Sequence, residues 1–175
     1  MTLGRIFGLA VSATPSAFAA HAVLWCALAL VVHQRLKPGF GKTIWISGVA
    51  IGLHILTILV HHFGHALAAH SVGHPMIGIR LWGLLGTSVY PEDEAALPDF
   101  SHLRRAVGGP VLSLIFVAVI ARLHVTGPSA RFLKAWLLVD NALGFVLGAL
   151  LPLNFTDGGT IRRYWPLRLA PARRA

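Results

Sequence analysis

The sequence predicts an all-α polytopic membrane protein with about four transmembrane helices and a short β-strand segment between the second and the third. Of its 175 residues, 55% are hydrophobic and only 12% are charged, with a mean hydropathy of +0.70. Soluble domains carry about a quarter charged residues. The apolar residues are also gathered in runs close to the ~20 residues that cross a bilayer. We expect residues 1–175 to form a single membrane domain in the lipid bilayer.

The first predicted span, residues 17–32, ends at the loop signal HQRLKPGFGK. The 20 residues at the N-terminus also resemble a signal peptide, with one Arg and the small-residue site Ala17-Phe18-Ala19. Because the apolar run continues directly beyond that site, we expect this segment to be retained in the protein and not cleaved.

The second predicted span, residues 44–72, is free of Asp, Glu, Lys and Arg. The third, residues 106–121, begins around the dipeptide Gly-Pro, and the fourth, residues 132–151, ends at LPLNFTDGG. A basic tail, residues 160–175, follows.

Residues 76–104, between the second and third spans, are predicted to form a membrane-associated segment of strands and loop. Residues 77–90 mix β-branched and aromatic residues with glycines, which favours short strands. The remainder is acidic and contains proline, which predicts a polar loop.

The formal net charge of +9 does not indicate a nucleic-acid partner, because the basic residues lie in the predicted loops and tail. Four spans place the N-terminus, the 76–104 segment and the C-terminus on one side, together with nine of the 15 Lys and Arg residues. The positive-inside rule then predicts both termini in the cytoplasm, with the protein in the cell (inner) membrane. The single cysteine, Cys26, lies in an apolar run, so the chain has no internal disulfide.

Two histidines at the end of the second span have the spacing of metal ligands. In VHHFGHALAAH, His61 and His65 are four residues apart, which places both imidazoles on one face of a helix. Histidines inside a span are costly and indicate a functional site by default. Asp157, after the fourth span, is expected at a similar membrane depth and is the candidate third ligand, leaving a fourth position to water. The alternative for Asp157 is an ordinary turn residue.

Other histidines are interpreted as solvated at span ends or hydrogen-bonded in the interior: His21, His33, His54, His70, His74 and His124.

Three motifs together resemble the site-2 proteases, a family of intramembrane zinc metalloproteases. The family's HExxH motif often continues as HEFGHALAA, and HHFGHALAAH matches it at every position except the Glu. A Gly-Pro dipeptide that opens the next span is matched by Gly109 and Pro110. The final motif is matched by ALLPLNFTDGG, except that Ala149 and Phe155 replace its usual Asn and second Pro. The resemblance covers about residues 44–162, in the family's order and spacing.

The resemblance implies that His61, His65 and Asp157 bind a zinc ion, Zn²⁺, and that His62 occupies the position of the catalytic Glu base. It implies substrates that are transmembrane proteins, unwound and cut inside the membrane or at its edge. It also implies a β-segment near the metal. Residues 77–90 are the candidate for that segment, pairing with an extended substrate by strand addition. The absence of PDZ-like insertions indicates a compact member.

His62 changes the expected chemistry. Zinc lowers the pKa of bound water to about 7 without a carboxylate, but a positioned base contributes a further ~10²–10⁴-fold. A Glu base becomes neutral when it accepts a proton, whereas His62 would become cationic beside zinc, which Coulomb repulsion disfavours. We therefore expect either a weakened peptidase or a non-catalytic pseudoprotease that binds membrane helices. Glu92 and Glu94 are alternative bases.

His62 also has alternative roles at the metal. On a helix surface it lies near His65, so it is able to replace His61 as a ligand or to occupy the position otherwise left to water.

A metal transporter is a further alternative, since the chain has ten histidines. Transport requires a polar path across several spans, and the first and third spans offer little of one. A haem with paired axial histidines is excluded for His61 and His65, because two ligands on one helix cannot reach opposite faces of one haem.

Overall fold

The structure of the protein is a computed structural model, of which residues 1–169 are described. Three helices are long and apolar enough to cross a membrane: α1 (Pro15–Leu36), α2 (Phe40–Ser71) and α3 (Asp99–Arg122). They cover the first three predicted spans. The third begins earlier than predicted, because the polar residues before the Gly-Pro dipeptide are also helical.

The predicted fourth span is divided between two shorter elements. The α-helix α4 (Pro128–Val139) continues directly into a π-helix, η1 (Asp140–Leu147). Neither element alone has the length of a spanning helix, and neither is among the three candidate spans in the described residues 1–169. The fourth span therefore stays a prediction. A segment of turns, residues 148–156, then leads to α5 (Asp157–Leu169), in which Asp157 is the first residue. The predicted basic tail begins inside α5, and residues 170–175 lie outside the described part of the chain.

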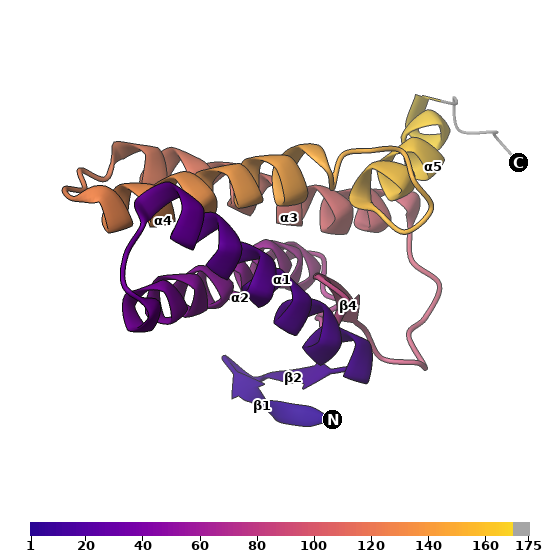
Figure 1. The fold of residues 1–175 in the computed structure, drawn as a ribbon. Helices are drawn as coiled ribbons and strands as arrows, with labels where there is room; N and C mark the ends of the chain where they lie inside the picture. The colour runs from indigo at the N-terminus through magenta and orange to yellow at the C-terminus, as the bar shows by residue number, and fades with distance from the viewer. Residues whose placement is uncertain (170–175) are drawn as a thin grey trace, which may run out of the picture.

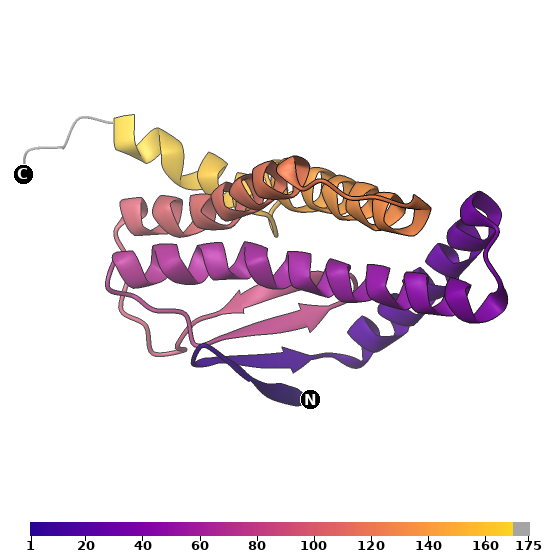
Figure 2. The same ribbon diagram turned by 90° about the vertical axis from the view of Figure 1, so that its left-hand side faces the viewer.

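A four-stranded sheet lies beside α2, as Figure 2 shows. Its strands are β1 (Thr2–Ile6), β2 (Leu9–Ala13), β3 (Gly78–Trp82) and β4 (Leu85–Val89), in the order β1-β2-β3-β4. The β2–β3 pair is parallel and the other two pairs are antiparallel. The strands expected in residues 77–90 are therefore present as β3 and β4.

The N-terminal hairpin β1–β2 precedes the first predicted span, and the sequence analysis did not predict it. Two left-handed residues, Phe7 (φ 48°) and Gly8 (φ 83°), form its turn. Leu9, Val11 and Ala13 are buried while their neighbours are only half-buried, which is the period-2 pattern of a strand with one face covered. Parallel pairing to a strand far away in the sequence decides the structure of this segment.

The inner face of the sheet packs against α2. Ile79 and Leu81 of β3 belong to the same buried cluster as Ile58 of α2. The antiparallel register places Ser88 of β4 opposite Ile79, and Gly86 opposite Leu81. Directly opposed residues share a face, so Ser88 and Gly86 also point toward α2. β4 is the last strand, and no strand within residues 1–169 pairs with its other edge.

Glycines bring α3 very close to α2, and Figure 1 shows the two helices side by side. A Cβ on Gly64 of α2 would lie 2.9 Å from Cα of Gly109, and a Cβ on Gly108 would lie 2.6 Å from Cβ of Ala68. Small residues of this kind allow helix backbones to approach within a membrane. The contact places the Gly-Pro dipeptide of α3 against the histidine pair of α2.

Candidate metal centre

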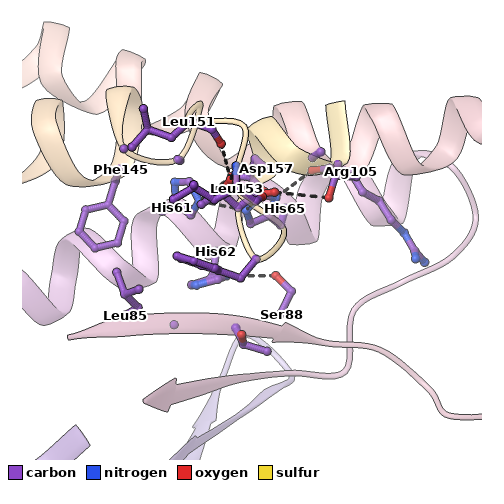
Figure 3. A pocket seen from close by; sticks show the side chains of 18 of the residues that line it. His61, His62, His65, Leu85, Ser88, Arg105, Phe145, Leu151, Leu153 and Asp157 are labelled. Atoms are coloured by element: carbon purple, nitrogen blue, oxygen red, sulfur yellow. Dashed lines mark hydrogen bonds and ion pairs between the residues drawn. The ribbon is translucent and has the colours of Figure 1, made fainter. Parts of the chain in front are cut away.

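Three of the residues selected from the sequence converge in space (Figure 3). Nε2 of His61 lies 3.1 Å from Oδ2 of Asp157, and Nε2 of His65 lies 3.4 Å from Oδ1. The two Nε2 atoms are 3.0 Å apart. Within residues 1–169 this is the one group of three or more His, Cys, Asp or Glu residues whose ligand atoms all lie within 4.8 Å of one another. We call these three residues the metal triad.

The other nitrogen of each triad imidazole is held by α3. Nδ1 of His65 lies 2.8 Å from the backbone oxygen of Arg105, and Nδ1 of His61 lies 3.1 Å from Oγ of Ser113. A carbonyl oxygen only accepts, so Nδ1 of His65 donates and its Nε2 carries a free lone pair. Outer partners of this kind fix the tautomer and the orientation of metal-binding histidines. Two Nε2 atoms and one carboxylate fit the donor set of a catalytic zinc site.

The close contact of Gly109 with the two triad imidazoles explains why a glycine precedes Pro110 in α3. A Cβ at position 109 would lie 2.6 Å from Nε2 of His61 and would also collide with the ring of His65. Both imidazoles therefore need a glycine on the facing helix.

The two glycines after Asp157 allow the chain to fold back on itself. The N–H of Gly158 donates to the oxygen of Ala149 at 2.8 Å. A Cβ on Gly158 would collide with the oxygen of Leu150, and a Cβ on Gly159 with the oxygen of Leu153. The 149–153 segment consequently packs over the start of α5 and holds Asp157 toward α2.

His62 points away from the metal triad and toward β4 (Figure 3). Its Nδ1 lies 3.0 Å from Oγ of Ser88, and its ring packs against Gly86. The centroid of its ring is 5.4 Å from that of His61 and 5.5 Å from that of His65. In this arrangement His62 neither replaces His61 nor occupies the fourth position of the site.

A cavity of about 670 Å³ opens beside the triad. One wall is β4, whose residues from Leu85 to Ser88 line it together with all three histidines of the α2 cluster. The opposite wall includes the small residues Gly144, Gly148 and Ala149. At one end Trp82 and Phe155 meet with their rings edge to face, 6.4 Å between centroids. The cavity thus combines a strand with an unpaired edge, small apolar residues and the triad.

The acidic loop does not supply a free base. Glu94 lines the cavity, but both its oxygens accept hydrogen bonds from the guanidinium of Arg105, one of them 2.9 Å from Nη1. Hydrogen bonding from Arg105 lowers the pKa of Glu94, with burial opposing it, so the carboxylate is committed to this ion pair. Glu92 is exposed and is not among the residues that line the cavity.

A second polar contact lies deeper along α2. Nδ1 of His54 lies 3.0 and 3.1 Å from the two oxygens of Asp140, and its Nε2 lies 3.2 Å from the oxygen of Leu84. His54 is therefore a hydrogen-bonded interior residue, as interpreted from the sequence. Both ring nitrogens of His54 therefore face oxygen atoms.

Sequence reasoning overlooked four residues that hold this region together: Ser88, Arg105, Ser113 and Asp140. Asp140 was visible as the one acidic residue in the predicted fourth span, and an acid in a span indicates a specific partner. The other three become apparent only when β4 and α3 are placed against α2.

Comparisons with known proteins agree with this geometry. No family model matches the sequence. Two curated proteins of Mycobacterium tuberculosis, from strains Erdman and H37Rv, are each named "Putative zinc metalloprotease Rip3". Each is 29% identical over 170 residues, which cover 92% of this chain but 42% of the relative. This chain thus spans less than half the length of these relatives.

The fold has a counterpart among solved structures. The site-2 protease from Methanocaldococcus jannaschii superposes with a TM-score of 0.61, covering 98% of this chain and 74% of that chain at 18% sequence identity. Such a likeness shows a shared fold. The chain is therefore a membrane protein with the site-2 protease fold, and its sequence resembles the site-2 protease family of zinc metalloproteases.

Proposed function

We propose that this chain is a site-2-protease-like intramembrane zinc peptidase that cleaves transmembrane protein substrates, weakened by the histidine at position 62. The observation that carries the proposal is the convergence of the metal triad beside the unpaired edge of β4. The triad supplies a donor set for zinc, and the strand supplies a way to hold an extended peptide next to it.

His61, His65 and Asp157 would hold the zinc ion. Zinc in such a site polarises a carbonyl and activates water. The hydrogen bonds between the two imidazoles and α3 keep both Nε2 atoms directed at one point. His62 occupies the sequence position of the family's proton acceptor, and its ring lies over β4 beside the triad. Because His62 ends cationic beside a cation, proton transfer to it is expected to be slow.

β4 would bind the substrate by strand addition. A transmembrane helix must unwind before its backbone can be cut, and unpaired backbone groups in a membrane each cost several kcal/mol, roughly. The free edge of β4 offers N–H and C=O partners to such a segment. Across the cavity, Gly144, Gly148 and Ala149 leave room for substrate side chains.

The test is cleavage by the purified protein in proteoliposomes with zinc, against a panel of single-span membrane proteins. We expect zinc-dependent cleavage within the span, lost in His65→Ala and in Asp157→Ala. His70→Ala is the matched control, because His70 is exposed on the same helix and does not line the cavity. Cleavage that persists in both triad variants would contradict the proposal.

A non-catalytic pseudoprotease is the second candidate. The observation that favours it is His62 itself, together with Ala149 and Phe155 in place of the family's Asn and Pro. In this case a photo-crosslinker placed at Thr87 of β4 would capture a transmembrane helix, while no panel member would be cut with zinc present.

A further inference from the structure

We propose that Ser88 is a positioning residue for His62: its hydroxyl holds the imidazole on the inner face of β4, beside the metal triad and not within it. The inference deepens the proposed function and rests on it for its catalytic consequence. The contact itself stands on geometry alone.

The hydrogen bond joins two elements that the sequence separates. His62 is 5% exposed on α2, and its Nδ1 meets Oγ of Ser88 at 3.0 Å. A histidine beside a metal site has several rotamers open to it unless a partner selects one. Ser88 is that partner on the strand which also lines the cavity.

Gly86 makes space for the same ring. It lies two residues before Ser88 and therefore on the same face of β4. A Cβ at position 86 would lie 2.6 Å from Cδ2 of His62 and 2.7 Å from Cγ2 of Ile58. On β4, Gly86 thus leaves space for the imidazole of His62, and Ser88 supplies the hydroxyl that bonds it. Pairing with β3 fixes the register of both residues.

The consequence is an open metal site. The ring of His62 is close enough to both triad histidines that a change of rotamer would direct it toward the ion. A fourth protein ligand would convert an open catalytic site into a closed structural one. Because turning that way breaks the hydrogen bond to Ser88, the hydroxyl keeps His62 out of the fourth position of the site.

The first arm of the test reads the ring directly. In zinc-loaded protein labelled with ¹⁵N-histidine, the His62 ring signals are identified by their absence in His62→Gln. We expect Ser88→Ala to move the Nδ1 signal and Ser88→Thr to leave it near the parent position. Ser71→Ala is the control, since that serine is exposed on α2 and bonds only the oxygen of Ala68. An unmoved Nδ1 signal in Ser88→Ala would overturn the inference.

The second arm reads catalysis. We expect Ser88→Ala to lower kcat about tenfold with KM changed less than twofold, and Ser88→Thr to restore kcat, since loss of an outer partner at a metal site typically costs ~10–100-fold. Equal kcat in the parent and Ser88→Ala would refute the positioning role. A parent that cuts no substrate but shows the Nδ1 shift would contradict the proposed function, while the contact between Ser88 and His62 would stand.

Discussion

Gly109 of α3 and His61 of α2 approach so closely that a Cβ on the glycine would lie 2.6 Å from Nε2 of the imidazole. The separation between the two helices is therefore set at the point where the metal ligands lie. Overpacking a well-packed site costs about 1–3 kcal/mol, and here the imidazoles themselves would have to move.

Gly109→Ala should weaken zinc binding at least tenfold, because both triad histidines lose their orientation. Competition with a fluorescent zinc chelator in detergent measures the affinity. Gly52→Ala is the matched control, as nothing lies within 4 Å of a Cβ at that position of α2. Unchanged affinity in Gly109→Ala would mean that the triad does not bind the ion.

His62→Glu should cut a membrane-helix substrate at least tenfold faster than the parent. A Glu base ends neutral where His62 ends cationic, and tenfold is a conservative part of the ~10²–10⁴-fold contribution of a positioned base. Initial rates in proteoliposomes give the comparison. His61→Ala should abolish cleavage in either background. Equal, robust rates in the parent and His62→Glu would show that the base lies elsewhere.

The ion pair between Glu94 and Arg105 should make stability depend on acid pH. Hydrogen bonding from Arg105 lowers the pKa of Glu94 from its ordinary 4.5. A lowered carboxyl pKa stabilises the fold fully above about pH 4.5, and this stabilisation is lost as the pH falls through the lowered value. The thermal midpoint of the parent should exceed that of Glu94→Gln at pH 7, and the difference should disappear in strong acid. Glu92→Gln, on an exposed residue, should behave as the parent throughout.

Asp140→Ala should destabilise the protein by about 1–3 kcal/mol, the usual cost of leaving a buried hydrogen-bonding group without its partner. It leaves His54 without its carboxylate and loosens η1 from α2. Unfolding in mixed detergent micelles measures the change. Replacing both residues, as in His54→Leu with Asp140→Leu, should recover part of the loss. Asp93→Ala, in the exposed loop, should be neutral; a similar loss there would mean that the pair is not responsible.

The sequence by itself indicated the membrane class, three spans and the histidine pair of the triad, with Asp157 as the candidate third residue. These depend on local signals: long apolar runs reflect the thickness of a bilayer, and the four-residue spacing of His61 and His65 reflects the pitch of one helix. The strands after α2 were also visible, because their β-branched and aromatic residues lie between glycines.

Only the tertiary structure decided the N-terminal hairpin, the division of the fourth predicted span, and the side on which His62 lies. β2 is a strand because it pairs with β3, more than sixty residues later in the chain, and no local pattern reports such pairing. The sequence allowed three places for the ring of His62: the position of the family's base, the ligand position of His61, and the fourth position of the metal site. The packing of β4 on α2 selected among them, because Gly86 supplied the space and Ser88 the hydrogen bond, and both come from a distant part of the chain.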